Sequence, residues 1–100
     1  MKVLFICNLG MNRSRTAAEL FKDQFETKCA GLYSNIVKKE ELELADLIVV
    51  MEESQRKELE KRFSQICRKK KIICLDILDV YLYNDPKLIK ILETKKDLIR

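Results

Sequence analysis

The residues whose types and spacing could carry chemistry lie near the N-terminus, in the sequence Cys7-Asn8-Leu9-Gly10-Met11-Asn12-Arg13-Ser14. The four residues before Cys7 are apolar, which favours a buried strand, and good helix formers follow from Thr16. A loop between a strand and a helix turns its backbone N–H groups, together with the positive end of the helix dipole, toward one point. Residues Asn8 to Ser14 are therefore predicted to bind an anion.

Cys7 is the candidate nucleophile of this loop. A thiol among N–H donors at a helix N-terminus ionises more readily than a free thiol, and its thiolate is nucleophilic. Arg13 offers a planar pair of donors that fits two oxygens of a phosphate, a geometry that lysine does not provide. Ser14 either caps the helix or donates its hydroxyl to the sulfur. Gly10, and after it Asn12, tolerates the positive φ that a tight anion-binding loop requires.

This pattern resembles the phosphate loop of cysteine-dependent phosphatases, in which five residues separate the cysteine from an arginine and a serine. Its position after the first strand is similar to that in the low-molecular-weight protein tyrosine phosphatases. Weaker similarity covers three further segments, Ala30-Gly31, Ala45 to Met51 and Asp85-Pro86. The resemblance implies that Cys7 attacks phosphorus, that Arg13 binds the phosphoryl oxygens, and that Asp85 protonates the leaving oxygen. It implies neither a cofactor nor a metal.

Asp85 has a second interpretation, because an aspartate followed by proline is also a common start of a helix. Other carboxylates are rivals for the role of general acid. Asp76 and Asp79 follow the last predicted strand, and Glu52 and Glu53 follow the strand before it.

The sequence departs from the family pattern at several positions. Gly10 stands where the family usually has an asparagine, and the serine and histidine that hold this asparagine are also missing. Asn12 replaces a second cysteine, Arg15 replaces a proline, and Lys87-Leu88 replace the aromatic residues after the Asp-Pro pair. These changes predict a less rigid loop, no protection of Cys7 by a neighbouring thiol, and different pocket walls.

Composition restricts the class of protein. One hundred residues predict a single domain over 1–100. The 20 basic and 16 acidic residues are mixed along the chain, unlike the concentrated basic patch that is typical of nucleic-acid binding. No apolar run is long enough for a signal peptide or a membrane span, so we expect a cytoplasmic protein without a membrane partner.

The chain contains no histidine. This absence excludes Ser-His-Asp triads, Cys-His dyads and histidine metal ligands, so the anion loop itself must activate Cys7. Cys29, Cys67 and Cys74 form no C-x-x-C pair, which favours reduced core thiols over structural zinc or disulfides. A redox partnership of Cys67 or Cys74 with Cys7, as in arsenate reductases that resemble the same family, stays an alternative.

Hydrophobic periodicity predicts alternating strands and helices. We expect strands over 3–6, 29–33, 47–51 and 71–75, and helices over 14–27, 38–44 and 53–70. Residues 76–84 are expected to be irregular, and Tyr81 and Tyr83 within them either wall a pocket or pack on the core. A last helix has an apolar face that comprises Leu88, Ile91, Leu92, Leu98 and Ile99.

This alternation predicts an α/β fold, a four-stranded parallel sheet of order 2-1-3-4 with helices on both faces. Ligands of such sheets bind beyond the carboxyl ends of the strands, which is where Cys7 lies. The predicted function is metal-independent hydrolysis of phosphate monoesters through a cysteinyl phosphate. Expected ligands are phosphate, sulfate and other oxyanions, and expected substrates are a phosphorylated small molecule or a phosphotyrosine-bearing protein.

Three alternatives stay open at this point: a phosphocarrier, an arsenate reductase-like protein and a non-catalytic phosphate-binding module. The phosphocarrier would resemble the small cysteine-phosphorylated subunits of sugar phosphotransferase systems. Those subunits generally lack an arginine at the sixth position after the cysteine, so Arg13 favours a phosphatase.

Overall fold

The computed structural model of the chain describes residues 1–99. Its four strands are β1 (Lys2–Cys7), β2 (Glu26–Gly31), β3 (Leu47–Val50) and β4 (Lys71–Cys74). All adjacent strands are parallel and their order is β2-β1-β3-β4, which confirms the predicted topology. The helices are α1 (Arg13–Phe21), α2 (Lys39–Leu44), α3 (Glu53–Arg62), α4 (Ser64–Lys69) and α5 (Pro86–Thr94), followed by a 3₁₀ turn (Lys96–Leu98).

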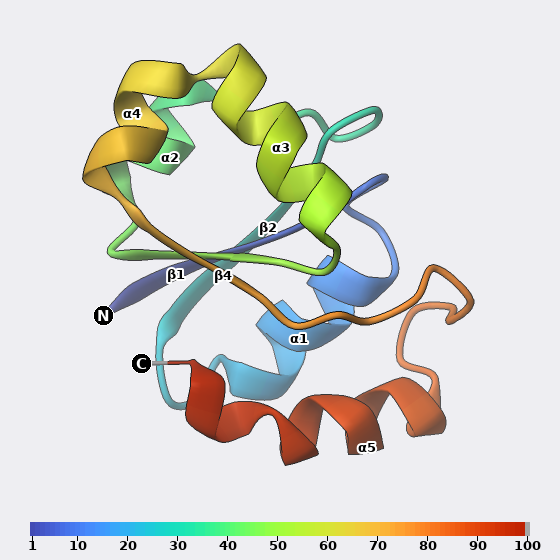
Figure 1. Cartoon of the computed structure of the whole chain (residues 1–100). Coiled ribbons are helices and arrows are strands. Elements are labelled where there is room, and N and C mark those ends of the chain that lie inside the picture. The colour runs from blue at the N-terminus through green and yellow to red at the C-terminus, as the bar shows by residue number, and fades with distance from the viewer. Residues whose placement is uncertain (100) are drawn as a thin grey trace.

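Helices cover both faces of the sheet, as Figure 1 shows. Side chains alternate along β1, so that Val3, Phe5 and Cys7 contribute to one apolar cluster, while Leu4 and Ile6 contribute to the other. The first cluster packs against α1 and α5, and the second against α2, α3 and α4. Because β1 is central and buried on both faces, its C-terminal end is held rigidly in the middle of the sheet.

The predicted helix over 14–27 is wrong at its C-terminal end. Helix α1 ends at Phe21, and residues 26–31 form β2, which pairs with the full length of β1 from Lys2 to Cys7. Phe25 fits the helical spacing because its side chain packs on the same core as Phe21. It lies, however, in the turn between α1 and β2. Backbone pairing along β1 therefore outweighed helix propensity here.

The single helix predicted over 53–70 is also wrong. Phe63 interrupts it with φ −135° and ψ 51°, so α3 and α4 are two helices. The side chains of Phe63 and Ile66 both pack on the second apolar cluster. The last helix is shorter than its apolar pattern suggests, because Leu98 lies in the 3₁₀ turn and is exposed, whereas Ile99 beyond it is buried.

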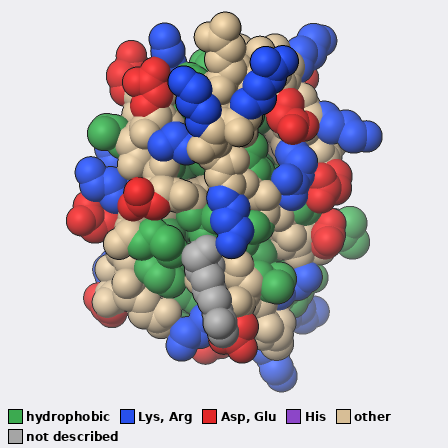
Figure 2. Space-filling model, turned by 60° about the vertical axis from the view of Figure 1, so that its left-hand side comes forward, with side chains coloured by type: hydrophobic (Ala, Val, Ile, Leu, Met, Phe, Trp, Pro, Cys, Tyr) green, Lys and Arg blue, Asp and Glu red, His purple; other side chains and the backbone are tan. Residues whose placement is uncertain are grey.

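The surface carries both signs of charge. On the face drawn in Figure 2, Lys and Arg side chains are interspersed with Asp and Glu side chains. Within residues 1–99, no helix is both long and apolar enough to cross a membrane.

Candidate active site

The carboxyl ends of three parallel strands bring the candidate site together. Cys7 ends β1, Glu52 follows β3, and Ile77 follows β4. The loop from residue 8 to residue 12 connects Cys7 to α1 at this edge (Figure 1). Its position confirms that the predicted anion loop lies at the carboxyl edge of the sheet, where the strand order reverses.

The Cys7 sulfur lies among hydrogen-bond donors. The backbone N–H of Gly10 donates to Sγ at 3.2 Å, and the Ser14 hydroxyl lies 3.0 Å from Sγ. Ser14 is inside α1 rather than at its cap, and its hydroxyl also donates to the Ala30 carbonyl at 3.4 Å. The sulfur is thus buried and contacted by two polar groups, one from the loop and one from α1.

Two glycines allow the loop to lie against β2. Gly10 has φ +67°, as predicted, and a Cβ there would lie 2.7 Å from the backbone nitrogen of Gly31. A Cβ at Gly31 would lie 2.1 Å from the Ser34 carbonyl oxygen. Asn12 does not adopt a positive φ; its Oδ1 instead accepts a hydrogen bond from the backbone N–H of Tyr83.

Arg13 is a buried charge, with a side chain only 1% exposed. Its Nη1 donates to the Ile77 carbonyl at 2.7 Å and lies 3.3 Å from Glu52 Oε1. Nη2 lies 3.5 Å from Asp79 Oδ1. Nε and Nη2 are both buried and make no hydrogen bond within residues 1–99. One edge of the guanidinium thus keeps two parallel donors for an oxyanion, while Nη1 is held by the protein.

The candidate acids lie at different places. Glu52 and Asp79 contact Arg13, whereas Asp76 lies 3.4 Å from the Cys74 sulfur. Asp85 is the N-cap of α5, and its carboxylate accepts the backbone N–H of Lys87 at 2.9 Å. The preceding residues bind to the start of α1 through Tyr83 and Asn84, so Asp85 begins its helix close to the anion loop.

Of the two tyrosines of the irregular segment, Tyr81 has the predicted core-packing role. Tyr81 is partly buried and packs on the first apolar cluster. Tyr83 is exposed, and the guanidinium of Arg15 lies 4.2 Å from the centre of its ring. This cation–π contact places an aromatic ring beside the first turn of α1.

Sequence reasoning missed Gln55, which is 1% exposed. Its Oε1 accepts the backbone N–H groups of Met51 and Glu52 at 2.8 and 3.0 Å, and its Nε2 donates to Asn8 Oδ1 at 3.1 Å. One buried amide therefore connects the anion loop to the backbone that carries Glu52. A glutamine at the third position of a helix suggests a capping interaction, but its second partner is 47 residues away.

We expect Gln55→Met to weaken binding of inorganic phosphate about tenfold, because Asn8 and Glu52 would lose their shared partner. The free energy of unfolding should fall by about 1–3 kcal/mol, since two buried N–H groups lose their acceptor. Calorimetric titration with phosphate and urea denaturation measure the two effects. Gln55→Glu keeps the acceptor, and a rotated Asn8 amide can donate to it, so its phosphate affinity should be closer to wild type.

Glu41→Met is the matched control for this experiment. Glu41 occupies the same helical position in α2 and accepts the backbone N–H of Lys38 at 2.8 Å, remote from the anion loop. The Glu41→Met variant should have a lower free energy of unfolding than wild type and the same phosphate affinity. Equal phosphate affinity in Gln55→Met and wild type would show that Gln55 only stabilises the fold.

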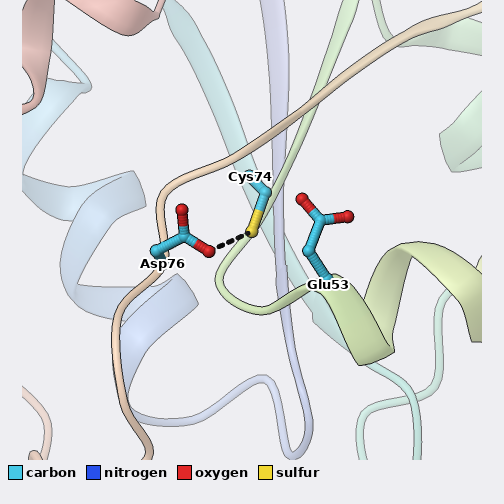
Figure 3. Close-up of side chains that lie close together, drawn as sticks. All are labelled: Glu53, Cys74 and Asp76. Atoms are coloured by element: carbon cyan, nitrogen blue, oxygen red, sulfur yellow. Dashed lines mark hydrogen bonds between the residues drawn. The ribbon is translucent and has the colours of Figure 1, made fainter.

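Glu53, Cys74 and Asp76 bring one potential metal-ligand atom each within 4.8 Å of the others (Figure 3). Protein contacts account for this group. The Cys74 thiol donates to Asp76, and the Glu53 carboxylate pairs with Arg56 Nε at 2.9 Å. Burial raises the pKa of the Cys74 thiol to about 11, which favours the protonated donor. Burial also raises the pKa of the Cys29 and Cys67 thiols, and all four cysteines are free.

The chain was compared with known proteins. No protein-family model matches it, and the comparison with curated protein sequences found no match. Solved structures do match. A low-molecular-weight protein tyrosine phosphatase from T. tengcongensis superposes with a TM-score of 0.77 at 21% identity, over 98% of this chain and 94% of that one.

Two arginine phosphatases superpose similarly. The drosophila enzyme DARP gives a TM-score of 0.74 at 18% identity, over 95% of this chain and 90% of that one. A C7S mutant of the arginine phosphatase YwlE has a phosphorylated active-site serine. It gives a TM-score of 0.73 at 19% identity, over 98% of this chain and 88% of that one. The chain has the low-molecular-weight protein tyrosine phosphatase fold. The loop after Cys7 lies at the carboxyl ends of the strands, which is where ligands bind in sheets of this topology.

Proposed function

We propose that the protein is a cysteine-dependent phosphatase that hydrolyses phosphate monoesters without a metal. The observation that carries this proposal is the Arg13 guanidinium, which is buried with Nε and Nη2 lacking hydrogen-bond partners among residues 1–99. Nε has no partner among the described residues and Nη2 has only an ion-pair contact with Asp79 at 3.5 Å, so a phosphoryl group can accept hydrogen bonds from both at once. The loop residues Asn8 to Ser14 are proposed to bind the remaining oxygens of the phosphoryl group. The same residues are proposed to bind inorganic phosphate and sulfate.

The proposed reaction has two steps. The Cys7 thiolate attacks phosphorus, the bond from phosphorus to the leaving oxygen breaks, and Asp85 gives that oxygen a proton. Water then attacks the cysteinyl phosphate and gives its proton to Asp85, while the S–P bond breaks and restores the thiolate. Throughout, Arg13 and the loop N–H groups stabilise the charge on the equatorial oxygens. The phosphorylated active-site serine of the YwlE mutant supports a covalent intermediate at this position.

The proposed substrates are phosphotyrosine-bearing proteins or small aryl phosphates. The structural similarity to arginine phosphatases makes phosphoarginine a second candidate. Hydrolysis of p-nitrophenyl phosphate, a phosphotyrosine peptide and a phosphoarginine peptide, each in the presence of EDTA, tests the proposal. Release of inorganic phosphate from none of them would contradict it.

Replacing Asp85 with asparagine should lower kcat/KM about 10²- to 10⁴-fold for phenyl phosphate, whose leaving oxygen needs a proton in the first step. The loss should be far smaller for 2,4-dinitrophenyl phosphate, which leaves as a stable anion. Measuring kcat/KM for both esters therefore isolates proton donation to the leaving group, because the later hydrolysis of the cysteinyl phosphate does not enter kcat/KM.

Asp79→Asn is the matched variant, because Asp79 is on the same irregular segment and contacts Arg13. If Asp79 only holds Arg13, its replacement should affect both esters to the same extent. A loss that depends on the leaving group in Asp79→Asn, and not in Asp85→Asn, would transfer the role of general acid to Asp79.

A further inference from the structure

The irregular segment between β4 and α5 is attached to the candidate site at both of its ends. The Ile77 carbonyl accepts Arg13 Nη1, and Asp79 contacts Nη2 of the same guanidinium. At the other end, the backbone N–H of Tyr83 donates to the side chain of Asn12 in the anion loop. The residues between these contacts therefore lie beside the site and not elsewhere on the surface (Figure 1).

This segment exposes apolar side chains on one side. Leu78, Val80 and Leu82 are 68%, 69% and 74% exposed, more than any other large hydrophobic residue that the structure describes as exposed. Their neighbours Ile77 and Tyr81 pack on the first apolar cluster, and Asp79 between them is half exposed and contacts Arg13. Three exposed apolar side chains at alternate positions of one segment are typical of an interaction surface.

The backbone of the same segment also lacks hydrogen-bond partners within the described residues. The N–H and C=O groups of residues 78–81 make no hydrogen bond with any residue in 1–99. A run of unpaired backbone groups beside alternating apolar side chains suits an extended polypeptide, which offers backbone partners and side chains together. A small phosphate ester offers neither. Asp79 is the single charged residue from 77 to 84, and it is paired with Arg13.

We propose that Leu78, Val80 and Leu82 form a docking strip for the polypeptide that carries the phosphorylated residue, and that the strip selects substrates with apolar side chains beside that residue. The proposal rests on the proposed phosphatase function and names the surrounding sequence of its substrate. An extended protein segment fits the strip because the residues around it contact Arg13 and Asn12, and its backbone groups are free beside the apolar side chains.

The test compares two phosphotyrosine peptides of equal length, one with leucines and one with serines on either side of the phosphotyrosine. In wild type, kcat/KM should be about tenfold higher for the leucine peptide, mainly through KM. The double variant Leu78→Ser/Leu82→Ser should abolish that difference and leave kcat/KM for p-nitrophenyl phosphate within about twofold, because this ester has no flanking residues.

Leu44→Ser/Leu98→Ser is the matched control, since these leucines are 59% and 54% exposed and lie on α2 and the 3₁₀ turn. It should retain the preference for the leucine peptide. A preference that persists unchanged in Leu78→Ser/Leu82→Ser would overturn the docking strip while leaving the phosphatase in place.

Binding of the fluorescent leucine peptide to the Cys7→Ser protein provides a readout that needs no turnover. Its fluorescence anisotropy should show a Kd about tenfold higher when the two strip leucines are serines. An unchanged Kd would overturn the proposal even if wild type hydrolyses no phosphate ester. A dimer in sedimentation equilibrium that the same variant dissociates would identify the strip as a contact between copies of this chain and would also overturn it.

Discussion

Replacing Cys7 with serine is expected to lower the hydrolysis of p-nitrophenyl phosphate by at least about a thousandfold. A serine hydroxyl stays protonated beside the Gly10 N–H and the Ser14 hydroxyl, and no histidine exists to remove its proton. The fold should be unaffected, because the change replaces one buried atom by a smaller one. Steady-state kinetics and thermal denaturation of the two proteins measure these effects.

Two further observations would show that Cys7 acts as the nucleophile. Rapid acid quenching during turnover should trap phosphate on Cys7, detectable by mass spectrometry of the peptide. Iodoacetate at pH 7 should modify this thiol first, and inorganic phosphate should protect it. Cys74 serves as the internal control, since burial raises its pKa to about 11 and keeps the thiol protonated at this pH. Undiminished hydrolysis by Cys7→Ser would contradict the mechanism.

Replacing Arg13 with lysine is expected to lower kcat/KM about 10²- to 10³-fold, although the positive charge is kept. An ammonium group cannot hold the Ile77 carbonyl and also present two parallel donors to a phosphoryl group. Kinetics with p-nitrophenyl phosphate and calorimetric titration with inorganic phosphate measure the loss. Phosphate affinity should fall together with the rate.

Arg56→Lys is the control for this substitution. Arg56 also donates to a backbone carbonyl, that of Ile72, and pairs with Glu53, but it lies outside the anion loop. Its replacement should leave the rate and the phosphate affinity close to wild type. A similar loss in both variants would mean that Arg13 acts only by stabilising the fold.

The sheet and the position of the anion loop were predictable because both depend on local patterns. Apolar runs marked β1, β3 and β4, whereas β2 begins three residues before its predicted range of 29–33. The position of Cys7 at the end of the first run placed it at the ligand edge. The positive φ of Gly10 followed from residue type in the same way. These features involve residues that are neighbours in the chain, so short-range rules apply to them.

The errors arose where tertiary contacts overrode local preference. Phe25 and Phe63 both fitted a helical period, yet each packs on the core from outside a helix. Periodicity reports which side of a segment is buried, but a turn can bury the same side chain as a helix. Gln55 was missed because a buried amide has no distinctive sequence pattern when its partner is remote.

The sequence by itself determined the chemistry of the site: a thiol, a flexible turn and a guanidinium within eight contiguous residues, with no imidazole to assist them. The tertiary structure decided which groups surround that guanidinium. Ile77 is 64 residues from Arg13 in the chain, and Glu52 and Asp79 follow different strands. Parallel strands end at one edge whatever their separation in sequence, so only the folded sheet brings these carboxylates, and the exposed strip beside them, to the anion loop.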